Sequence, residues 1–271
     1  MLVLAEVSKT YARGVQALSP TSLTVESGRV TVLLGPSGAG KSTLLRCMNM
    51  LVRPTTGTVK AEGLPALESR RALREHRRQT GMVFQHHQLI PRYTALRNVL
   101  LGRVAYHPFL RGLLPACRGD LDIALKSLDQ VGLLDKSLER ADHLSGGEQQ
   151  RVGIARALAQ QPRLILADEP VASLDPGTAR RVMTLLRRVC EQNGITLVAS
   201  LHQVDLALLH ADRIVGLAHG SIVYDGPPAD VSDRVLRLIY DDTRRGSRDS
   251  APISGDDTVD TPDVPIRSTI N

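Results

Sequence analysis

Residues 35–42 read GPSGAGKS and constrain the fold more than any other stretch of the chain. They match G-x-x-x-x-G-K-[ST], the pattern of a loop whose backbone N–H groups surround a phosphate. The apolar run 30–34 leads into this segment, and an apolar-periodic segment from Thr43 leads out of it. A chance glycine turn before a helix is the alternative, but it leaves the lysine, the hydroxyl and both flanking elements unexplained. The segment therefore predicts a nucleotide-phosphate site between a strand and a helix.

The residue types within this loop each have a physical role. Glycines allow the backbone to turn tightly, so that its N–H groups point at an anion, and the N-terminus of the following helix adds partial positive charge. We expect Lys41 to bring a full positive charge to the β- and γ-phosphates, and Ser42 to offer a hydroxyl to Mg²⁺. The candidate nucleotide-binding residues of this stretch are Gly35, Pro36, Ser37, Gly38, Ala39, Gly40, Lys41, Ser42 and Thr43.

The bulk composition narrows the class of protein. A length of 271 residues suggests one or two domains. No apolar run reaches the ~18 residues that a membrane-spanning helix needs, and residues 1–14 lack the features of a signal peptide. The three cysteines, Cys47, Cys117 and Cys190, are scattered. Their number and spacing indicate reduced thiols rather than a disulfide or zinc framework.

The chain is basic, with a formal net charge of +6. Part of the excess lies in one cluster, which consists of Arg70, Arg71, Arg74, Arg77 and Arg78. Such a cluster can bind nucleic acid or anionic lipid, but a solvated helix face explains it more simply. Only seven aromatic residues are present, none of them Trp, so surfaces for base stacking are scarce. We therefore favour the solvated face and expect no nucleic-acid partner.

The order of the expected elements indicates an α/β fold. Apolar strands are expected at 81–84, 164–167 and 196–200, and a helix covers 178–192 between the last two. Strands that alternate with helices predict a mainly parallel sheet with helices on both faces. Residues 2–8 and 21–34 predict a small strand assembly before the loop, and 88–160 a helical insertion. We assign 1–243 to one nucleotide-binding domain and 244–271, which is poor in apolar residues, to a disordered tail.

Polar residues follow three of the expected strands, where ligands of such sheets bind. Asp168 ends the apolar run 164–167 and is expected to hold Mg²⁺, while Glu169 can orient or deprotonate an attacking water. Gln85 can join Mg²⁺ or water as a neutral amide. His202 can donate to a γ-phosphate or to water; a lone histidine is usually structural, but its place after a buried strand favours a role in the site.

A second anion-binding feature lies at 144–148, which read LSGGE. Ser145, Gly146 and Gly147 open an apolar-periodic helix, whose free N–H groups suit an anion. One chain does not need two sites for one γ-phosphate. We therefore expect this feature to contact ATP held by another subunit.

Taken together, these motifs resemble the ATP-binding subunit of an ABC transporter, from about residue 2 to residue 242. GPSGAGKS is similar to the Walker A motif, LSGGE to the signature and LILADE to the Walker B motif. Gln85 falls at the Q-loop, Asp175 at the D-loop and His202 at the switch histidine. Tyr11 falls where the family has an adenine-stacking aromatic; its position alone leaves an ordinary half-exposed tyrosine equally open.

The resemblance implies a P-loop ATPase fold that consists of a parallel core, a small antiparallel subdomain and an inserted helical subdomain. It implies ATP hydrolysis with Mg²⁺ held by Ser42, Gln85 and Asp168, with Glu169 as catalytic base and His202 positioning water. It also implies a head-to-tail homodimer, two membrane permease subunits and an extracytoplasmic substrate-binding protein. The chain would then be peripheral, on the cytoplasmic face of the inner membrane.

A narrower resemblance is to the phosphonate-importer ATPases, carried by VFQHHQLIPRYTALRNVLLGR and by RADHLSGGEQQRVGIARALAQQPRLILADEPVASLDP. Importers of phosphite or hypophosphite have similar ATPases and stay open as alternatives. Residues 86–87 and 106–118 are not motif positions, and the tail after 244 has no counterpart. Two rivals remain outside import. They are a soluble ABC-type ATPase that acts on nucleic acid, which the arginine cluster keeps open, and a non-catalytic nucleotide-binding regulator, against which Lys41 and Glu169 argue.

Overall fold

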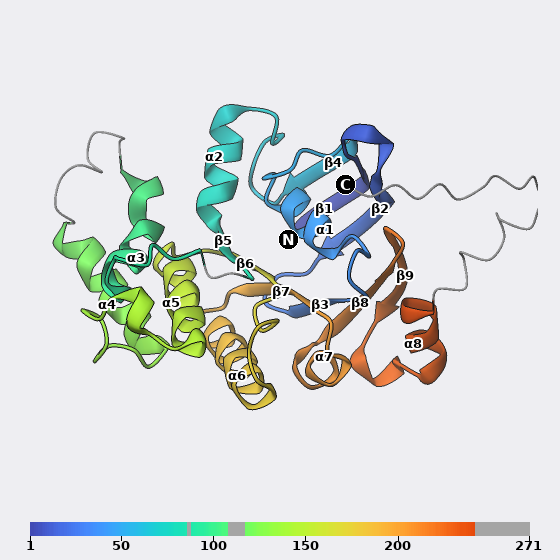
Figure 1. The fold of residues 1–271 in the computed structure, drawn as a ribbon. Coiled ribbons are helices and arrows are strands. Elements are labelled where there is room, and N and C mark those ends of the chain that lie inside the picture. Colours follow the sequence, from blue (N-terminus) through green and yellow to red (C-terminus); the bar gives the residue numbers. More distant parts are fainter. Residues whose placement is uncertain (86–87, 108–116, 242–271) are drawn as a thin grey trace, which may run out of the picture. The chain divides into compact units, whose positions relative to one another are not determined.

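The computed structural model describes residues 1–85, 88–107 and 117–241, and its core is a six-stranded sheet (Figure 1). The strand order is β5-β6-β7-β3-β8-β9, and every neighbouring pair is parallel except β8 and β9. The bounds are β3 (Val30–Leu34), β5 (Thr80–Val83), β6 (Leu164–Asp168), β7 (Thr196–Leu201), β8 (Arg213–Ala218) and β9 (Ser221–Gly226). The predicted mainly parallel sheet is thus confirmed.

A second, smaller sheet is wholly antiparallel and has the order β2-β1-β4. It consists of β1 (Leu2–Thr10), β2 (Gln16–Val25) and β4 (Thr56–Ala61), with the 3-10 turn η1 (Ala12–Gly14) between the first two. This is the predicted antiparallel subdomain. Its third strand, β4, follows the phosphate loop in the sequence, whereas β1 and β2 precede it. The small sheet thus joins chain segments from before and after that loop.

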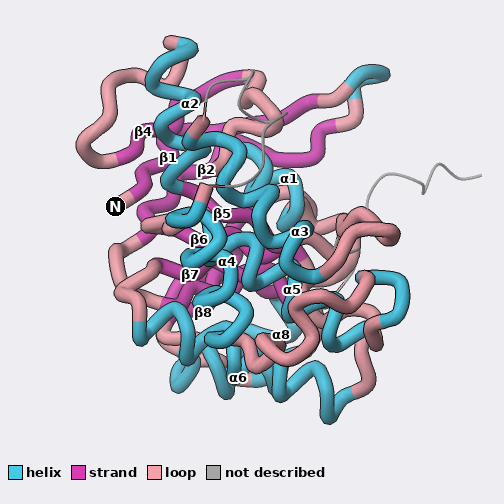
Figure 2. The backbone as a smooth tube through the Cα atoms, turned by 90° about the vertical axis from the view of Figure 1, so that its left-hand side faces the viewer, coloured by secondary structure: helices cyan, strands magenta, loops and turns pink. Residues whose placement is uncertain are grey.

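Helices follow or separate the strands, and α3, α4 and α5 lie together at the left of Figure 1, the side that faces the viewer in Figure 2. The α-helices are α1 (Lys41–Met48), α2 (Arg70–Gln79), α3 (Ala95–Leu100), α4 (Arg118–Gln130), α5 (Gly146–Ala159), α6 (Pro176–Gln192), α7 (Val204–His210) and α8 (Asp233–Tyr240). Shorter 3-10 helices are η2 (Leu101–Tyr106), η4 (Ala141–His143) and η5 (Pro228–Asp230). No helix in the described part of the chain is long and apolar enough to span a membrane.

Both faces of the large sheet are buried, which explains why its strands read as continuous apolar runs. In β6, Ile165 and Ala167 belong to a core shared with α5 and α6. Leu164 and Leu166 belong to a second core, shared with α1 and the small sheet. Because side chains alternate along a strand, Asp168 continues the second set and points to the α1 side.

Some details of the helices were not expected from the sequence. The arginine cluster expected on a helix face lies in α2, which begins at Arg70 because the Ser69 hydroxyl accepts from the Ala72 N–H at 3.1 Å. Helices α7 and α8 were not predicted, since seven and eight residues are too short for an apolar period to repeat.

Residues 1–240 form one compact unit. The helical subdomain at 88–160 and the domain end at 243 stay predictions, and the predicted tail 244–271 lies outside the described residues.

Two glycines among the helices between β5 and β6 give a test of the packing there. A Cβ on Gly102 would lie 2.3 Å from the backbone oxygen of Arg156 in α5, whereas a Cβ on Gly119 in α4 would meet no atom within 4 Å. We expect Gly102→Ala to lower the free energy of unfolding by about 1–3 kcal/mol, because backbone must move. Gly119→Ala should instead raise it by about 0.4–1 kcal/mol, because alanine favours helix and lowers the entropy of the unfolded chain. Urea denaturation of both variants measures this, and equal losses would contradict it.

Candidate functional site

Three neighbouring parallel strands bring the candidate site residues to one edge of the sheet. Asp168, the last residue of β6, lies opposite Ser200 of β7, and Leu201 of β7 lies opposite Leu34 of β3. Gly35 and His202 therefore leave the sheet side by side, next to Asp168. Gln85 follows β5, where Val83 lies opposite Ala167, so it belongs to the same edge.

The phosphate loop is closed tightly against the rest of the fold. A Cβ on Gly35 would lie 2.3 Å from the backbone oxygen of Leu217, and one on Gly40 would lie 2.7 Å from that of Ala17. Gly40 also has a φ of +100°, which L side chains rarely adopt. Glycine is needed at both positions. A P-loop sequence thus folds here into a cradle that opens toward the start of α1.

Lys41 lies at the centre of this cradle. Its ammonium donates to the backbone oxygens of Gly35 and Pro36, both at 2.8 Å. The side chain is 3% exposed. Burial lowers the pKa of Lys41 to about 8, although the nearby Glu169 and Asp168 carboxylates act to raise it. The loop thus keeps a cation whose charge depends on the neighbouring acids and on any anion that enters.

Ser42 and Asp168 form the candidate magnesium site. The Ser42 hydroxyl donates to Asp168 Oδ1 at 2.7 Å, and the Arg46 guanidinium lies 3.6 Å from Asp168 Oδ2. Asp168 is almost fully buried, and a buried carboxylate needs a positive or hydrogen-bonding partner. A hydroxyl and a carboxylate are hard oxygen donors of the kind that Mg²⁺ prefers, so the residues present fit this ion. Gln85, just past the end of the neighbouring β5, is half-buried.

Glu169 and His202 contact each other directly. His202 Nε2 and Glu169 Oε1 form a hydrogen bond, beside a small hollow that Ser200 and Gln203 also line. Glu169 has a φ of +47°, a left-handed conformation that costs about 1–3 kcal/mol for a residue with a side chain. Its N–H donates to the Ser200 hydroxyl at 2.9 Å, which helps to hold it there. Strain of this kind is typical of functional positions.

The second nitrogen of His202 connects this pair to the phosphate loop. His202 Nδ1 lies 3.2 Å from Lys41 Nζ and 3.1 Å from the Gly35 oxygen. A neutral ring that donates from Nε2 to Glu169 accepts at Nδ1 from Lys41. A protonated ring donates to Gly35 instead. The backbone oxygen of His202 accepts from the Tyr240 hydroxyl at 3.0 Å, so α8 also positions this histidine.

Tyr11 lies beside the start of α1. Its hydroxyl is 3.5 Å from the Thr43 hydroxyl, and the side chain is 39% exposed. The Lys9 ammonium lies 5.3 Å from the ring centroid. The ring is thus close enough to the phosphate loop for a nucleotide base to reach it.

Residues of the LSGGE segment line a second hollow. Ser145 caps α5 in a reciprocal capping box with Glu148, and Ser145 and Gly146 are exposed. Asp175 caps α6 by accepting from the Thr178 N–H at 2.9 Å. Both helix starts line one hollow. Within the described residues, none of the hydrogen bonds of 145–147 reaches the phosphate loop.

Two supporting residues escaped the analysis of the sequence. The Ser200 hydroxyl accepts from Glu169 and donates to Asp168 Oδ1 at 3.1 Å, and Tyr240 anchors His202. Ser200 carried a weak signal, as a hydroxyl near the end of an otherwise apolar strand. Tyr240 carried none, because its helix was not predicted.

The chain was compared with protein families, curated proteins and solved structures. The model of the family described as "ABC transporter" matches residues 18–172. The phosphonates import ATP-binding protein PhnC 3 of Nostoc sp. is 55% identical over 252 residues, 93% of this chain and 96% of the relative. The phosphite import ATP-binding protein PxtA of Stutzerimonas stutzeri is 58% identical over 240 residues, 89% of this chain and 87% of the relative.

A solved structure supports the fold independently. It is described as a dimeric, post-hydrolysis state of the ATP-binding cassette MJ0796 bound to ADP and Pi. It is 36% identical to this chain, has a TM-score of 0.72, and covers 84% of this chain and 99% of its own.

The buried position of Lys41 gives a prediction for nucleotide affinity. The free protein loses the Lys41 charge as the pH rises through about 8, whereas bound phosphates would keep that charge by raising the pKa. Nucleotide binding should therefore weaken about eightfold between pH ~7.5 and pH ~9. Titration with a fluorescent nucleotide analogue measures this. Lys41→Ala should bind more weakly and lose this dependence; equal slopes in both proteins would contradict the assignment.

Proposed function

The chain belongs to the ABC transporter family, and we propose that it is the ATP-hydrolysing subunit of an importer for phosphonates. The observation that carries the activity is the contact between Glu169 and His202 at the edge of the sheet where Lys41 lies. The substrate rests on the relatives: one is a phosphonate import protein, and another, equally similar, is a phosphite import protein. Phosphite is therefore the second candidate.

Several residues of the proposed hydrolysis contact one another: Glu169 with His202, His202 with Lys41, and Ser42 with Asp168. Lys41 and the N–H groups of the phosphate loop bind the β- and γ-phosphates. Glu169 accepts a proton from the attacking water, and His202 orients that water and the γ-phosphate. Ser42, Asp168 and Gln85 would hold Mg²⁺, which would supply positive charge near the phosphate oxygens. Phosphoryl transfer depends mainly on positioning and electrostatics, so these contacts support the proposed roles.

A complete site requires two copies of the chain. Ser145 and Gly146 are exposed on a helix start, where N–H groups favour an anion. We propose that two subunits pair head to tail, with each signature segment facing the nucleotide of the partner. Asp175 lines the same hollow and would lie at this interface.

The remaining partners follow from the proposed import role. Two membrane permease subunits would carry the substrate, and an extracytoplasmic binding protein would deliver it. The chain would then be a peripheral protein on the cytoplasmic face of the membrane. A nucleic-acid ATPase is disfavoured because part of the arginine cluster is engaged within the fold: Arg77 Nε donates to the Asn49 oxygen at 3.5 Å, and Arg78 pairs with Glu75 at 2.9 Å.

Two substitutions test the catalytic base and the dimer. Glu169→Gln should bind ATP normally but lower kcat by about 10²–10⁴-fold, because the general base is lost.

Because Glu169→Gln keeps its ATP, this variant should form dimers, which size-exclusion chromatography with light scattering measures. Adding Gly146→Asp should prevent dimer formation. A Cβ at Gly146 meets only Leu174, at an ordinary 3.7 Å, and an acid in the first turn favours the helix. The variant should therefore keep its fold, while the added charge repels an approaching phosphate. Robust turnover by Glu169→Gln would refute the catalytic role, and dimers of the double variant the interface.

Growth on single phosphorus sources tests the substrate. A strain that lacks this chain and any redundant importer should grow on inorganic phosphate but not on an alkylphosphonate or 2-aminoethylphosphonate. The wild-type chain should restore growth, and Glu169→Gln should not, because transport needs hydrolysis. Loss on phosphite alone would favour the second candidate. Unchanged growth on all sources would refute both substrates while leaving the ATPase.

A further inference from the structure

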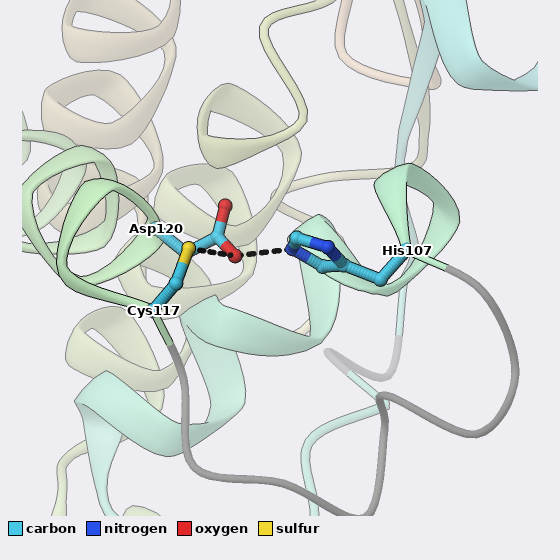
Figure 3. Close-up of side chains that lie close together, drawn as sticks. All are labelled: His107, Cys117 and Asp120. Carbon is cyan, nitrogen blue, oxygen red and sulfur yellow. Dashed lines mark hydrogen bonds and ion pairs between the residues drawn. The ribbon is translucent and has the colours of Figure 1, made fainter.

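Three side chains of different chemistry meet at the junction of η2 and α4, away from the nucleotide site (Figure 3). They are His107, just after η2, Cys117, just before α4, and Asp120 in the first turn of α4. One donor atom from each lies within 4.8 Å of the other two. Imidazole, thiol and carboxylate are the three side-chain types that bind Zn²⁺ in proteins. The proposed ATPase chemistry uses none of the three.

The carboxylate of Asp120 is held in a fixed orientation. Asp120 Oδ1 accepts from Arg103 Nε at 2.9 Å, and both side chains are buried. Arg103 Nη1 in turn donates to the Ala159 oxygen at 3.0 Å and to Gln161 at 3.1 Å. Such outer partners orient metal ligands in known sites. Because Arg103 occupies Oδ1, only Oδ2 faces His107 and Cys117.

The contacts among the three residues place their donor atoms around one point. Cys117 Sγ lies 3.1 Å from Asp120 Oδ2, and His107 Nε2 contacts the same oxygen. In a tetrahedral zinc site, ligand atoms at ~2.0–2.3 Å from the ion lie roughly 3.3–3.8 Å from one another. Binding of the ion would require His107 Nε2 to move away from Asp120 Oδ2. The ring has room to do so, because the His107 side chain is 23% exposed and lines an open hollow beside α2.

The surrounding charge selects the class of ion. Arg71, Arg74 and Arg78 line the same hollow, and Glu75, which also lines it, offsets only Arg78. The excess of positive charge disfavours a hard cation such as Mg²⁺ or Ca²⁺, which is held by electrostatics alone. A thiophilic ion gains a bond to the Cys117 thiolate, which a hard cation does not. The hydrogen-bond network without a metal is the competing explanation, since the thiol, the imidazole and the guanidinium can all donate to Asp120.

We propose that His107, Cys117 and Asp120 bind a thiophilic divalent metal ion of the Zn²⁺ class, with water as the fourth ligand. On binding, the Cys117 thiol releases its proton, and the proton on His107 Nε2 is released or moves to Nδ1, so that each group presents a lone pair. The ion would tie the end of η2 to the start of α4. Cysteine spacing alone predicted no zinc framework, because only one of the ligands is a cysteine.

Cobalt titration of the full-length protein, without nucleotide, tests this site. Co²⁺ bound by a thiolate in a tetrahedral site shows intense d–d bands and a near-ultraviolet charge-transfer band. The band can be assigned to Cys117, because burial raises the pKa of Cys47 to about 11 and that of Cys190 to about 12. We expect the charge-transfer band to saturate at one Co²⁺ per chain and to disappear on addition of Zn²⁺, and we expect a higher Tm with Zn²⁺. The phosphate site can bind Co²⁺ through oxygen only, so it gives no such band.

Matched variants decide between the metal site and the hydrogen-bond network. Cys117→Ser should abolish the charge-transfer band, and His107→Gln should abolish it or weaken Co²⁺ binding by at least 10-fold. His143→Asn, which changes an exposed histidine outside the cluster, should leave the band unchanged. Unaltered circular dichroism would show that the variants fold. A wild-type protein with reduced thiols and no band, or a His107→Gln protein with unchanged binding, would overturn the proposal.

Discussion

The parallel register of β6, β7 and β3 is the constraint on which the site depends. It sets Asp168 opposite Ser200 and Leu201 opposite Leu34, so that three chain segments leave the sheet together. Side chains alternate along a strand, and a shift of one residue would turn Asp168 toward the other face. The register is fixed because both faces of the sheet are buried in separate apolar cores. Core packing far from the nucleotide therefore decides whether Asp168 meets Ser42.

Burial of charge at this edge is tolerated only because each group has a partner. Asp168 accepts from Ser42 and from Ser200, and Lys41 donates to two loop oxygens. Removing charges from water costs several kcal/mol each unless such partners exist. The same contacts leave Lys41 and Asp168 ready for a phosphate and a cation, because those ligands can replace the present partners without exposing either charge to an apolar core.

Local patterns predicted most of this arrangement, and long-range contacts account for what they missed. The phosphate loop and the Asp168–Glu169 pair were predictable because glycine spacing and apolar runs are local signals. The roles of Ser200 and Tyr240 depend on which strands and helices become neighbours in space. Helix α8 was not predicted at all. The sequence likewise did not predict that His107, Cys117 and Asp120 lie together. Their side chains converge only when η2 and α4 pack against α5, partly through Arg103.

Glu148 lies in the first turn of α5, at the helix start that would face a phosphate. Its negative charge would repel that phosphate unless another group neutralises it. Its bond to Lys136, and then its bonds to Ser145, lower the pKa of Glu148 to about 2, so it stays ionised. Lys136 lies 2.6 Å from Glu148 Oε1 and cancels that charge locally. The carboxylate is also turned back onto the Ser145 N–H at 2.9 Å. The capping box thus fixes the helix start while its acid is neutralised, and the N–H groups at Gly146 and Gly147 remain the charge that an approaching phosphate would meet.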